Sequence, residues 1–205
     1  MVVTKIELIK KEYYRVDLEY TFAFALYKSE IRQYGLKEGM ELSTQLIQVI
    51  QQDIVIPRAR KKAMMLLQYR DRTKEELRSR LLEAQFHQDV VEDAISYVES
   101  YGYINDERYI EQYISFQKEK KSKKQLQMEL LKKGIAKQEI ANYMEENEWD
   151  EFDDLRTLVQ KRCFGKSLNE EKELQKQYAY FMRKGYQYSD IKRAIQQYML
   201  ECTQE

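Results

Sequence analysis

The sequence predicts a mainly helical protein: three tandem three-helix repeats of helix-turn-helix-like form, in an elongated array, behind a small amino-terminal β/α extension. An internal repeat is the first observation behind this prediction. Residues 81–86, 130–135 and 181–186 share one pattern of apolar, charged and turn residues, at offsets of 49 and 51. A fixed period of this size is typical of repeat proteins, in which each unit buries part of its apolar face against its neighbour. The second observation is that the amino-terminal segment follows a different, alternating pattern.

This alternating pattern predicts short β-strands. Polar and apolar residues alternate at 4–8, 14–18 and 22–26, with β-branched and aromatic residues among them. A period of two is typical of strands that have one covered face. Residues 29–34 and 43–54 have the character of helices that could cover that face, because a small sheet needs a partner for its apolar side.

Pro57 predicts a break or kink between the extension and the repeats. Proline suits the first turn of a helix but removes a hydrogen bond from a helix interior. We therefore place a domain boundary at this residue. The predicted segments are the extension at residues 1–56 and the repeats at residues 57–105, 106–153 and 154–205.

Each repeat is predicted to contain three helices, A, B and C, of which B and C form a helix-turn-helix pair. Helix B opens at Thr73 in the first repeat, with Glu76 three residues on, and at Ser122 in the second, with Gln125. Both fit the capping box, in which the two side chains satisfy backbone N–H groups reciprocally. The third repeat carries an extra loop, residues 165–169, between helices A and B.

Helix B is predicted to bury one leucine-rich face and to end at a glycine. The leucines of this face occupy matching positions in the first two repeats: Leu77, Leu81 and Leu82, then Leu126, Leu130 and Leu131. Gly134 and Gly185 stand where helix B should end and supply a left-handed cap that other residues resist. The first repeat has Gln85 there, so we expect its turn to be more strained or differently shaped.

Composition excludes several classes of function. Hydrophobic residues make up 43% of the chain and charged residues 34%, so a core is possible but much of each helix faces water. No apolar run approaches eighteen residues and no basic-then-apolar leader is present, so we expect a cytoplasmic monomer without a membrane segment. Two cysteines and one histidine provide no metal cluster. With no phosphate-binding glycine loop and no nucleophile–base set, we expect neither a cofactor nor an enzyme.

Charge is strongly segregated although the net charge is zero. Residues 58–80 carry nine basic and three acidic residues, and residues 117–133 carry seven basic and two acidic ones. Residues 145–154 carry seven acidic side chains and no basic one. We interpret them as a solvated loop before the third repeat; contact with a basic surface of a partner is the alternative. Such segregation creates local potentials that the whole-chain charge hides.

The basic residues near the turns of the repeats are our candidates for binding a partner or DNA. Positive charge recurring at a structural period could follow phosphates and give salt-dependent, sequence-independent affinity. An ordinary solvated helix face, neutralised by neighbouring carboxylates, is the alternative. The candidates are Arg70, Arg72, Lys74, Arg78, Arg80, Lys118, Lys120, Lys121, Lys123, Lys124, Lys132, Lys133, Arg183 and Lys184.

Several conspicuous residues have simpler interpretations. Trp149 is expected to pack at a junction between repeats, and Cys163 to pack as a small hydrophobic residue. His87 is expected in a turn or cap. Five tyrosines fall on helical apolar spacing, where a ring can be buried while its hydroxyl stays wet, so we assign them to core edges rather than to base stacking. They are Tyr97, Tyr101, Tyr109, Tyr113 and Tyr143.

Three short motifs, in order, resemble the RecX family of recombination regulators. They are Arg-Asp-Arg-Thr-Lys-Glu-Glu-Leu at 70–77, Gly-Tyr-Ile-Asn-Asp at 102–106 and Glu-Leu-Leu-Lys-Lys-Gly-Ile at 129–135. With the triple repeat, the resemblance covers roughly residues 58–200, and the amino-terminal strands look like the extension of Gram-positive members. Asn105, where the family usually has an acidic residue, and Gln85 depart from the pattern, and both concern turns.

The resemblance implies a cytoplasmic protein that binds the RecA recombinase, chiefly as a filament on DNA, and inhibits strand exchange and the co-protease function. It implies a curved array of three-helix bundles in the groove of the filament. From the basic turns we also expect weak, sequence-independent contact with single- or double-stranded DNA. A helix-turn-helix transcription factor is the alternative, and a generic helical scaffold is a third. Against the transcription factor, helix C carries acidic residues such as Asp89, Glu92 and Glu139, which phosphates would repel.

Overall fold

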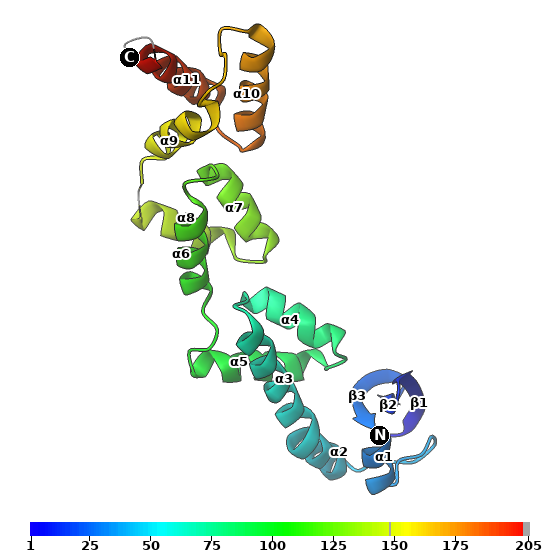
Figure 1. Ribbon diagram of the computed structural model, residues 1–205. Coiled ribbons are helices and arrows are strands. Elements are labelled where there is room, and N and C mark those ends of the chain that lie inside the picture. The colour runs from blue at the N-terminus through cyan, green and yellow to red at the C-terminus, as the bar shows by residue number, and fades with distance from the viewer. Residues whose placement is uncertain (148, 203–205) are drawn as a thin grey trace. The chain divides into compact units, whose positions relative to one another are not determined.

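The computed structural model describes residues 1–147 and 149–202, which divide into two compact units, Met1–Asn105 and Asp106–Glu205 (Figure 1). The first unit contains β1 (Val3–Lys10), β2 (Tyr13–Leu18), β3 (Thr21–Tyr27), α1 (Lys28–Gln33), α2 (Thr44–Ile50), η1 (Gln51–Val55), α3 (Ile56–Tyr69), α4 (Lys74–Glu83) and α5 (Gln88–Ser100). The second contains α6 (Asp106–Gln117), α7 (Lys123–Lys132), α8 (Lys137–Glu146), α9 (Glu151–Cys163), α10 (Glu171–Arg183) and α11 (Tyr188–Cys202). The predicted fold class, mainly helical with three three-helix repeats after a small sheet, is confirmed. The division into four segments stays a prediction.

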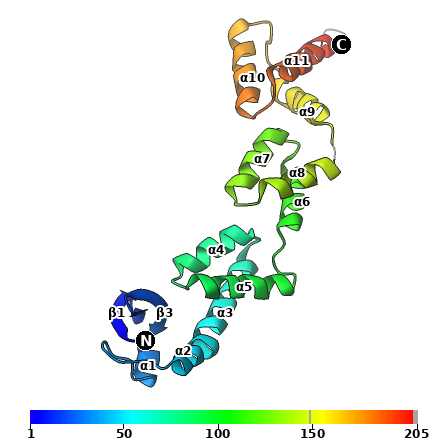
Figure 2. The same cartoon turned by 180° about the vertical axis from the view of Figure 1, so that it is seen from behind.

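The three predicted strands form one antiparallel sheet in the order β1-β2-β3, and Figures 1 and 2 show them as a curled group of ribbons next to α1. Val16 and Phe24 are paired across β2 and β3, and both are buried. The pairing follows from the alternation of the sequence, since every second side chain points to the same face.

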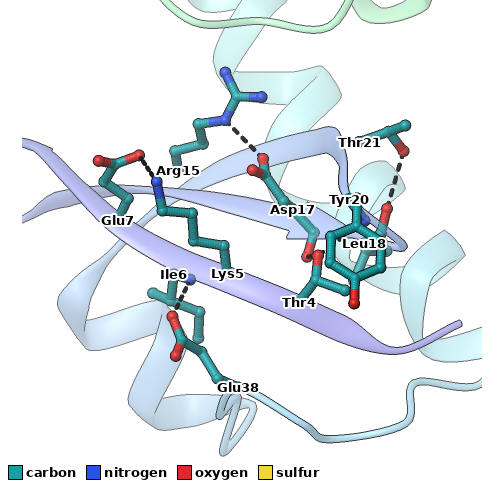
Figure 3. Close-up of polar contacts among 10 residues, drawn as sticks. All are labelled: Thr4, Lys5, Ile6, Glu7, Arg15, Asp17, Leu18, Tyr20, Thr21 and Glu38. Carbon is teal, nitrogen blue, oxygen red and sulfur yellow. Dashed lines mark hydrogen bonds and ion pairs between the residues drawn. The ribbon is translucent and has the colours of Figure 1, made fainter.

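Side chains complete the hydrogen bonds of the sheet where strands lack a neighbour (Figure 3). Along the outer edge of β1, the Glu38 carboxylate accepts the Ile6 N–H at 2.8 Å. At the β2–β3 turn, Thr4 Oγ1 accepts the Tyr20 N–H at 2.9 Å and donates to the Asp17 carbonyl at 3.2 Å. Occupied donors make a sheet edge a poor template for pairing with another chain.

Pro57 does not break the chain, contrary to the prediction. Helix α2 continues through a π-helical turn, η1, directly into α3, whose first turn contains Pro57. The Ile56 N–H reaches back five residues to the Gln51 carbonyl, as in a π-helix. A π-helical turn changes the hydrogen-bond spacing, and the first turn of a helix tolerates a residue without an N–H. The proline is therefore accommodated within a continuous helical path.

The sheet and the first repeat share one hydrophobic core. Val16, Phe24 and Leu26 of the strands belong to the same buried cluster as Ala59 of α3 and Leu77 of α4. In the second unit, the second and third repeats have a core each. The second repeat buries Ile110, Ile114, Leu126, Leu130, Ile135 and Ile140, and the third buries Leu155, Val159, Cys163, Leu168, Phe181, Tyr186, Ile191, Ala194 and Ile195.

Helix B buries a narrower face than predicted. Leu81 and Leu130 are completely buried, whereas the next residues, Leu82 and Leu131, are 42% and 39% exposed. Met182 in the third repeat is 54% exposed and follows the buried Phe181 in the same way. Adjacent residues are about 100° apart around a helix, so a residue beside a core position turns toward water. The prediction that Leu82 and Leu131 line the core is therefore wrong.

One of the two predicted capping boxes is complete. Thr73 Oγ1 accepts the Glu76 N–H at 3.1 Å, and the Glu76 carboxylate accepts the Thr73 N–H at 3.3 Å. In the second repeat, Ser122 Oγ accepts the Gln125 N–H at 3.1 Å, but Gln125 Nε2 donates to Glu129 instead. The Ser122 N–H has another partner, the Lys184 carbonyl of the third repeat at 3.4 Å. Packing between two repeats has thus replaced half of the local motif.

The turns between helices B and C share a left-handed residue. Gly134 and Gly185 have φ of 82° and 86°, and Gln85 of the first repeat has φ of 66°. The first turn is therefore not differently shaped, although a glutamine in this conformation is strained. Gly185 has a further role, because a Cβ there would lie 2.4 Å from Ser122 Oγ. Only glycine allows the turn of the third repeat to approach the start of α7 so closely.

Candidate partner and nucleic-acid interface

Of the nine basic residues at 58–80, four form ion pairs within the first repeat and a fifth, Arg58, pairs with the extension. Helix C of this repeat, α5, faces α3 and α4 with carboxylates that meet their basic residues. Arg78 shows the pattern: its guanidinium binds Glu92 at 2.7 Å and Glu75 at 2.5 Å, which raises the pKa of Arg78 and lowers that of Glu92. The remaining pairs are Arg58–Glu30, Arg60–Asp93 at 2.7 Å, Lys74–Glu99 at 2.6 Å and Arg80–Glu83 at 2.8 Å.

Arg72 is not a surface cation. Its side chain is buried, and its Nε donates to the Leu66 carbonyl at 3.3 Å near the end of α3. Burial lowers the pKa of Arg72, and nearby Arg70 and Arg80 lower it further. Arg72 therefore holds the turn between α3 and α4, while Arg70 is exposed and its side chain forms no ion pair within the described ranges.

The turn between α6 and α7 of the second repeat is different, because several of its lysines keep their charge available. Lys120 and Lys124 are exposed, and their side chains form no hydrogen bond or ion pair with any residue that the structure describes. Lys118 is half-buried, and its charge lowers the pKa of Asp154, which burial raises. Lys123 lies over the Trp149 ring at 4.6 Å.

Lys121 is the paired lysine of this turn. Its Nζ lies 2.7 Å from Glu129 Oε2, which also accepts the Tyr113 hydroxyl at 2.6 Å. Burial raises the pKa of Glu129, but hydrogen bonds from Lys121, Tyr113 and Gln125 outweigh it, so the net shift is downward. Lys121 therefore holds the end of α6 against α7, and its paired charge contributes little to the positive electrostatic potential at the surface.

The turns after helix B add two exposed cations. Lys132 and Arg183 occupy matching positions in the second and third repeats, and neither side chain has an ion-pair partner in the described chain. Their neighbours lie on aromatic faces instead: Lys133 is 5.3 Å from the Tyr109 ring centre and Lys184 is 5.8 Å from that of Tyr180. Stacking on a ring keeps the positive charge while fixing the side chain.

The acidic segment 145–154 has a structural role at the junction of the second and third repeats. The Asp150 carboxylate caps α9, and Glu151 Oε1 accepts the Lys123 N–H at 2.6 Å, at the amino end of α7. A carboxylate is stabilised there by the positive end of the helix dipole. The interpretation as a solvated loop is therefore wrong for the described part: residues 145–146 end α8 and residues 151–154 begin α9.

A hollow of about 510 Å³ lies at this junction, lined from both repeats. Lys123 and Trp149 stand on one side, and Arg193 lies 3.6 Å from the ring centre of Phe152. Trp149 also packs against the core of the second repeat, as predicted for a junction residue. The lining mixes lysine, arginine, carboxylates and rings, which suits contact between repeats better than a chemical reaction.

The remaining residues singled out in the sequence are structural. His87 Nδ1 accepts the Asp89 N–H at 3.4 Å and caps α5, and Cys163 is buried in the third core. Within the described ranges, no three metal-binding side chains gather around one point, and no helix is both long and apolar enough to cross a bilayer. Tyr97, Tyr109, Tyr113 and Tyr143 are half-buried against the cores as predicted, whereas Tyr101 is 62% exposed.

The sequence reasoning missed three aromatic residues. Tyr69, Phe116 and Phe164 are 85%, 75% and 83% exposed, and each lies at the carboxyl end of helix A in its repeat. Aromatic residues were assigned to cores because of their helical spacing. Their helical spacing does not distinguish these residues from core residues. Their position in the sequence, next to the basic turns, was the signal that could have indicated that they are exposed.

The fold defines a class: a protein of three tandem three-helix modules that follow a small antiparallel sheet. Three family models match the chain in order. They are the first three-helix domain of RecX at residues 59–97, the second at 105–144 and the third at 149–195. The chain belongs to the RecX family, as the motifs predicted.

Curated relatives and solved structures agree with this assignment. The regulatory protein RecX of Clostridium acetobutylicum is 26% identical over 97% of both chains. That of Clostridioides difficile is 26% identical over 95% of this chain and 94% of its own. A crystal structure of regulatory protein RecX has a TM-score of 0.59 at 23% identity, covering 94% of this chain and 98% of its own. The crystal structure of RecX from Lactobacillus salivarius has a TM-score of 0.60 at 24% identity, covering 71% and 97%. The chain is thus a regulatory protein of RecX type, which favours a non-enzymatic role.

Proposed function

We propose that this chain binds the RecA recombinase assembled on DNA and lowers its recombination and co-protease activities. Membership of the RecX family over all three repeats is the observation that carries the proposal. The protein acts as a monomer in the cytoplasm, without cofactor or catalysis of its own.

The unpaired cations support a contact with DNA as part of this function. Lys120 and Lys124 in the second repeat, with Lys132 and Arg183 after helix B, are exposed and free of carboxylates in the described chain. Exposed lysines and arginines bind phosphates by releasing counterions, whatever the base sequence. In the first repeat, only Arg70 among our five candidates has this character; the others are paired or buried.

Inhibition follows from binding one state of a polymer more tightly than another. A chain of similar modules can contact several subunits of a filament, and occupying their surface blocks growth or access by other proteins. A bound protein shifts such an equilibrium only by its difference in affinity for the two states. No chemical step is required.

The test is binding to RecA filaments on single-stranded DNA. Wild-type protein should sediment with the filaments and slow strand exchange, and inertness toward filaments would remove the proposal. A footprint confined to particular duplex sequences would favour the transcription-factor alternative.

Charge reversal tests the DNA contact within this function. The variant Lys120→Glu/Lys124→Glu should weaken binding to single-stranded DNA and reduce the slope of log affinity against log salt by about 1.4, since each lost phosphate contact removes about 0.7. The matched control is Lys10→Glu/Lys37→Glu, which removes two exposed lysines of the extension and should leave the slope unchanged. An unchanged slope in the first variant means that these lysines do not touch phosphate.

A further inference from the structure

Each repeat has a strongly exposed aromatic ring within two residues of the carboxyl end of helix A, although the three rings do not occupy equivalent helix positions. Tyr69 is the last residue of α3, Phe116 the next-to-last of α6, and Phe164 directly follows α9. They are the most exposed of the large apolar side chains described in the helical repeats, at 85%, 75% and 83%. Isolated exposed apolar residues are common on proteins, but in all three repeats the most exposed ring lies at the end of helix A that enters the basic turn or loop before helix B.

No other aromatic ring or cation of the described residues stacks on these three rings. None of the three takes part in a ring–ring or cation–ring contact, although many aromatic residues of the same repeats do, such as Tyr97, Tyr113 and Tyr180. Burying a phenylalanine side chain stabilises a protein by roughly 1.5–3 kcal/mol. These rings, which are 75–85% exposed, contribute only a small part of that to the fold, so their faces are available to a ligand.

Positive charge flanks each ring. Arg70 follows Tyr69 directly and is exposed. Lys118 and Lys120 come two and four residues after Phe116. Lys161 and Lys166 stand on either side of Phe164, and Lys166 has only a distant carboxylate, Glu173 at 3.9 Å. In each case at least one of these cations is exposed, namely Arg70, Lys120 and Lys161. A free aromatic face combined with nearby positive charge is the way in which proteins hold unpaired bases and their phosphates.

We propose that Tyr69, Phe116 and Phe164 are base-stacking residues for single-stranded DNA, one in each repeat, with the adjacent cations holding the backbone. This inference deepens the DNA contact of the proposed function and rests on it. It names the ligand as single-stranded, because the base faces of a duplex are already stacked on one another and closed to a side chain. Stacking on a ring is indifferent to base identity, so binding is without sequence preference.

The experiment measures DNA binding in the absence of RecA, so that its failure and the failure of RecA regulation can be told apart. Fluorescence anisotropy with a labelled oligothymidine and a duplex of equal length compares wild type with Tyr69→Leu, Phe116→Leu and Phe164→Leu. Leucine keeps an apolar side chain but has no π face. Each substitution is expected to lower affinity for the single strand about five- to tenfold, at the weaker end of measured stacking contributions, and to leave duplex affinity unchanged.

Two further variants serve as controls for the stacking interpretation. Tyr20→Asn removes the exposed ring of the β2–β3 turn, which is 90% exposed, and asparagine tolerates the positive φ of that residue; single-strand affinity should be as in wild type. Phe116→Trp should keep affinity, and the added tryptophan fluorescence should be quenched by oligothymidine beyond any change from Trp149 in the parent protein.

The proposal is overturned if the three leucine variants, folded by circular dichroism, bind oligothymidine like wild type. It is also overturned if they lose single-strand and duplex affinity equally, because a general loss does not report stacking. If they bind DNA normally but fail to sediment with RecA filaments, the rings contact protein, and regulation of RecA stands while base stacking does not.

Discussion

The first and second repeats have the same three-helix arrangement but differ in how many basic residues of their A–B turns are paired with carboxylates. Their basic segments look alike in sequence, with an excess of six and of five positive charges. In the first repeat, Arg78 and Lys74 are held by Glu92 and Glu99 of α5. In the second, the side chains of Lys120 and Lys124 have no such partner among the described residues.

The difference lies in helix C. In the first repeat, the carboxylates of α5 fall on the side that packs toward α3 and α4, where they pair with Arg60, Lys74 and Arg78. In the second, Glu139, Glu145 and Glu146 of α8 are exposed and form no ion pair with the lysines of the α6–α7 turn. The local field of a repeat therefore depends on which residues face each other across helices, and segment charge alone does not predict it.

The largest expected effect is a loss of stability when a buried leucine of helix B is truncated. Leu81→Ala and Leu130→Ala should each lower the free energy of unfolding by about 2–5 kcal/mol, because both side chains are fully buried. The neighbours Leu82→Ala and Leu131→Ala should change it by only about 0.5 kcal/mol. Urea unfolding of the four variants checks this. Equal losses at Leu130 and Leu131 would show that the second repeat does not share the helix register of the first.

A smaller effect concerns the left-handed residue after helix B. Gln85→Gly should raise the free energy of unfolding by roughly 0.5–1 kcal/mol, since glycine adopts φ of 66° without steric cost. Gly134→Gln, the reverse exchange in the second repeat, should lower it by about 1 kcal/mol. Thermal unfolding of both variants is the measurement. If Gln85→Gly destabilises the protein, the glutamine side chain makes a contact worth more than its backbone strain.

The smallest effect is the pH dependence of two carboxylates, one from each repeat. A hydrogen bond from Arg78 lowers the pKa of Glu92 in the folded protein, and those from Lys121, Tyr113 and Gln125 do so for Glu129 against the effect of burial. A lowered folded-state pKa stabilises the protein above the ordinary glutamate value of 4.5, and this stabilisation is lost as the pH falls through the folded-state pKa.

Glu92→Gln and Glu129→Gln should therefore lower stability at pH 7 and matter less below pH of about 4. The loss is expected to be a few tenths of a kcal/mol at Glu92, whose side chain is 43% exposed and screened by water. It should be larger at Glu129, which is 26% exposed and has three hydrogen-bond donors. Unfolding measured from pH 3 to 7 gives both values. A pH-independent difference would mean that neither pKa is lowered.

Sequence reasoning was strongest where a local rule acts within one element. The three strands, the complete cap at Thr73 and the histidine cap at His87 depend on residues within a few positions of each other. It failed where a distant residue intervened. The carbonyl of Lys184 took the Ser122 N–H that the second capping box needed. The error at Leu131 was local instead, because a residue next to the core position Leu130 turns away from the core.

The candidate interface shows the same division. The positions of basic residues near turns are readable from the chain, as are the family motifs between residues 70 and 135. The sequence does not reveal which of those basic residues remain unpaired. Arg72 is the clearest case, because no local sequence pattern predicts that its side chain is buried against the Leu66 carbonyl. The exposed rings of Phe116 and Phe164 were likewise invisible to periodicity, which describes the helix but not where its packing against neighbours stops.

The sequence by itself determined the architecture: a small sheet, then three copies of a three-helix module, because periodicity and caps act over a few residues and repeat along the chain. Tertiary structure alone decided which charges are cancelled and which faces stay open. Ion pairs such as Arg60–Asp93 and contacts such as that of Gly185 with Ser122 join residues more than thirty positions apart. Electrostatic and steric energies depend on distance in space, which the order of residues does not state.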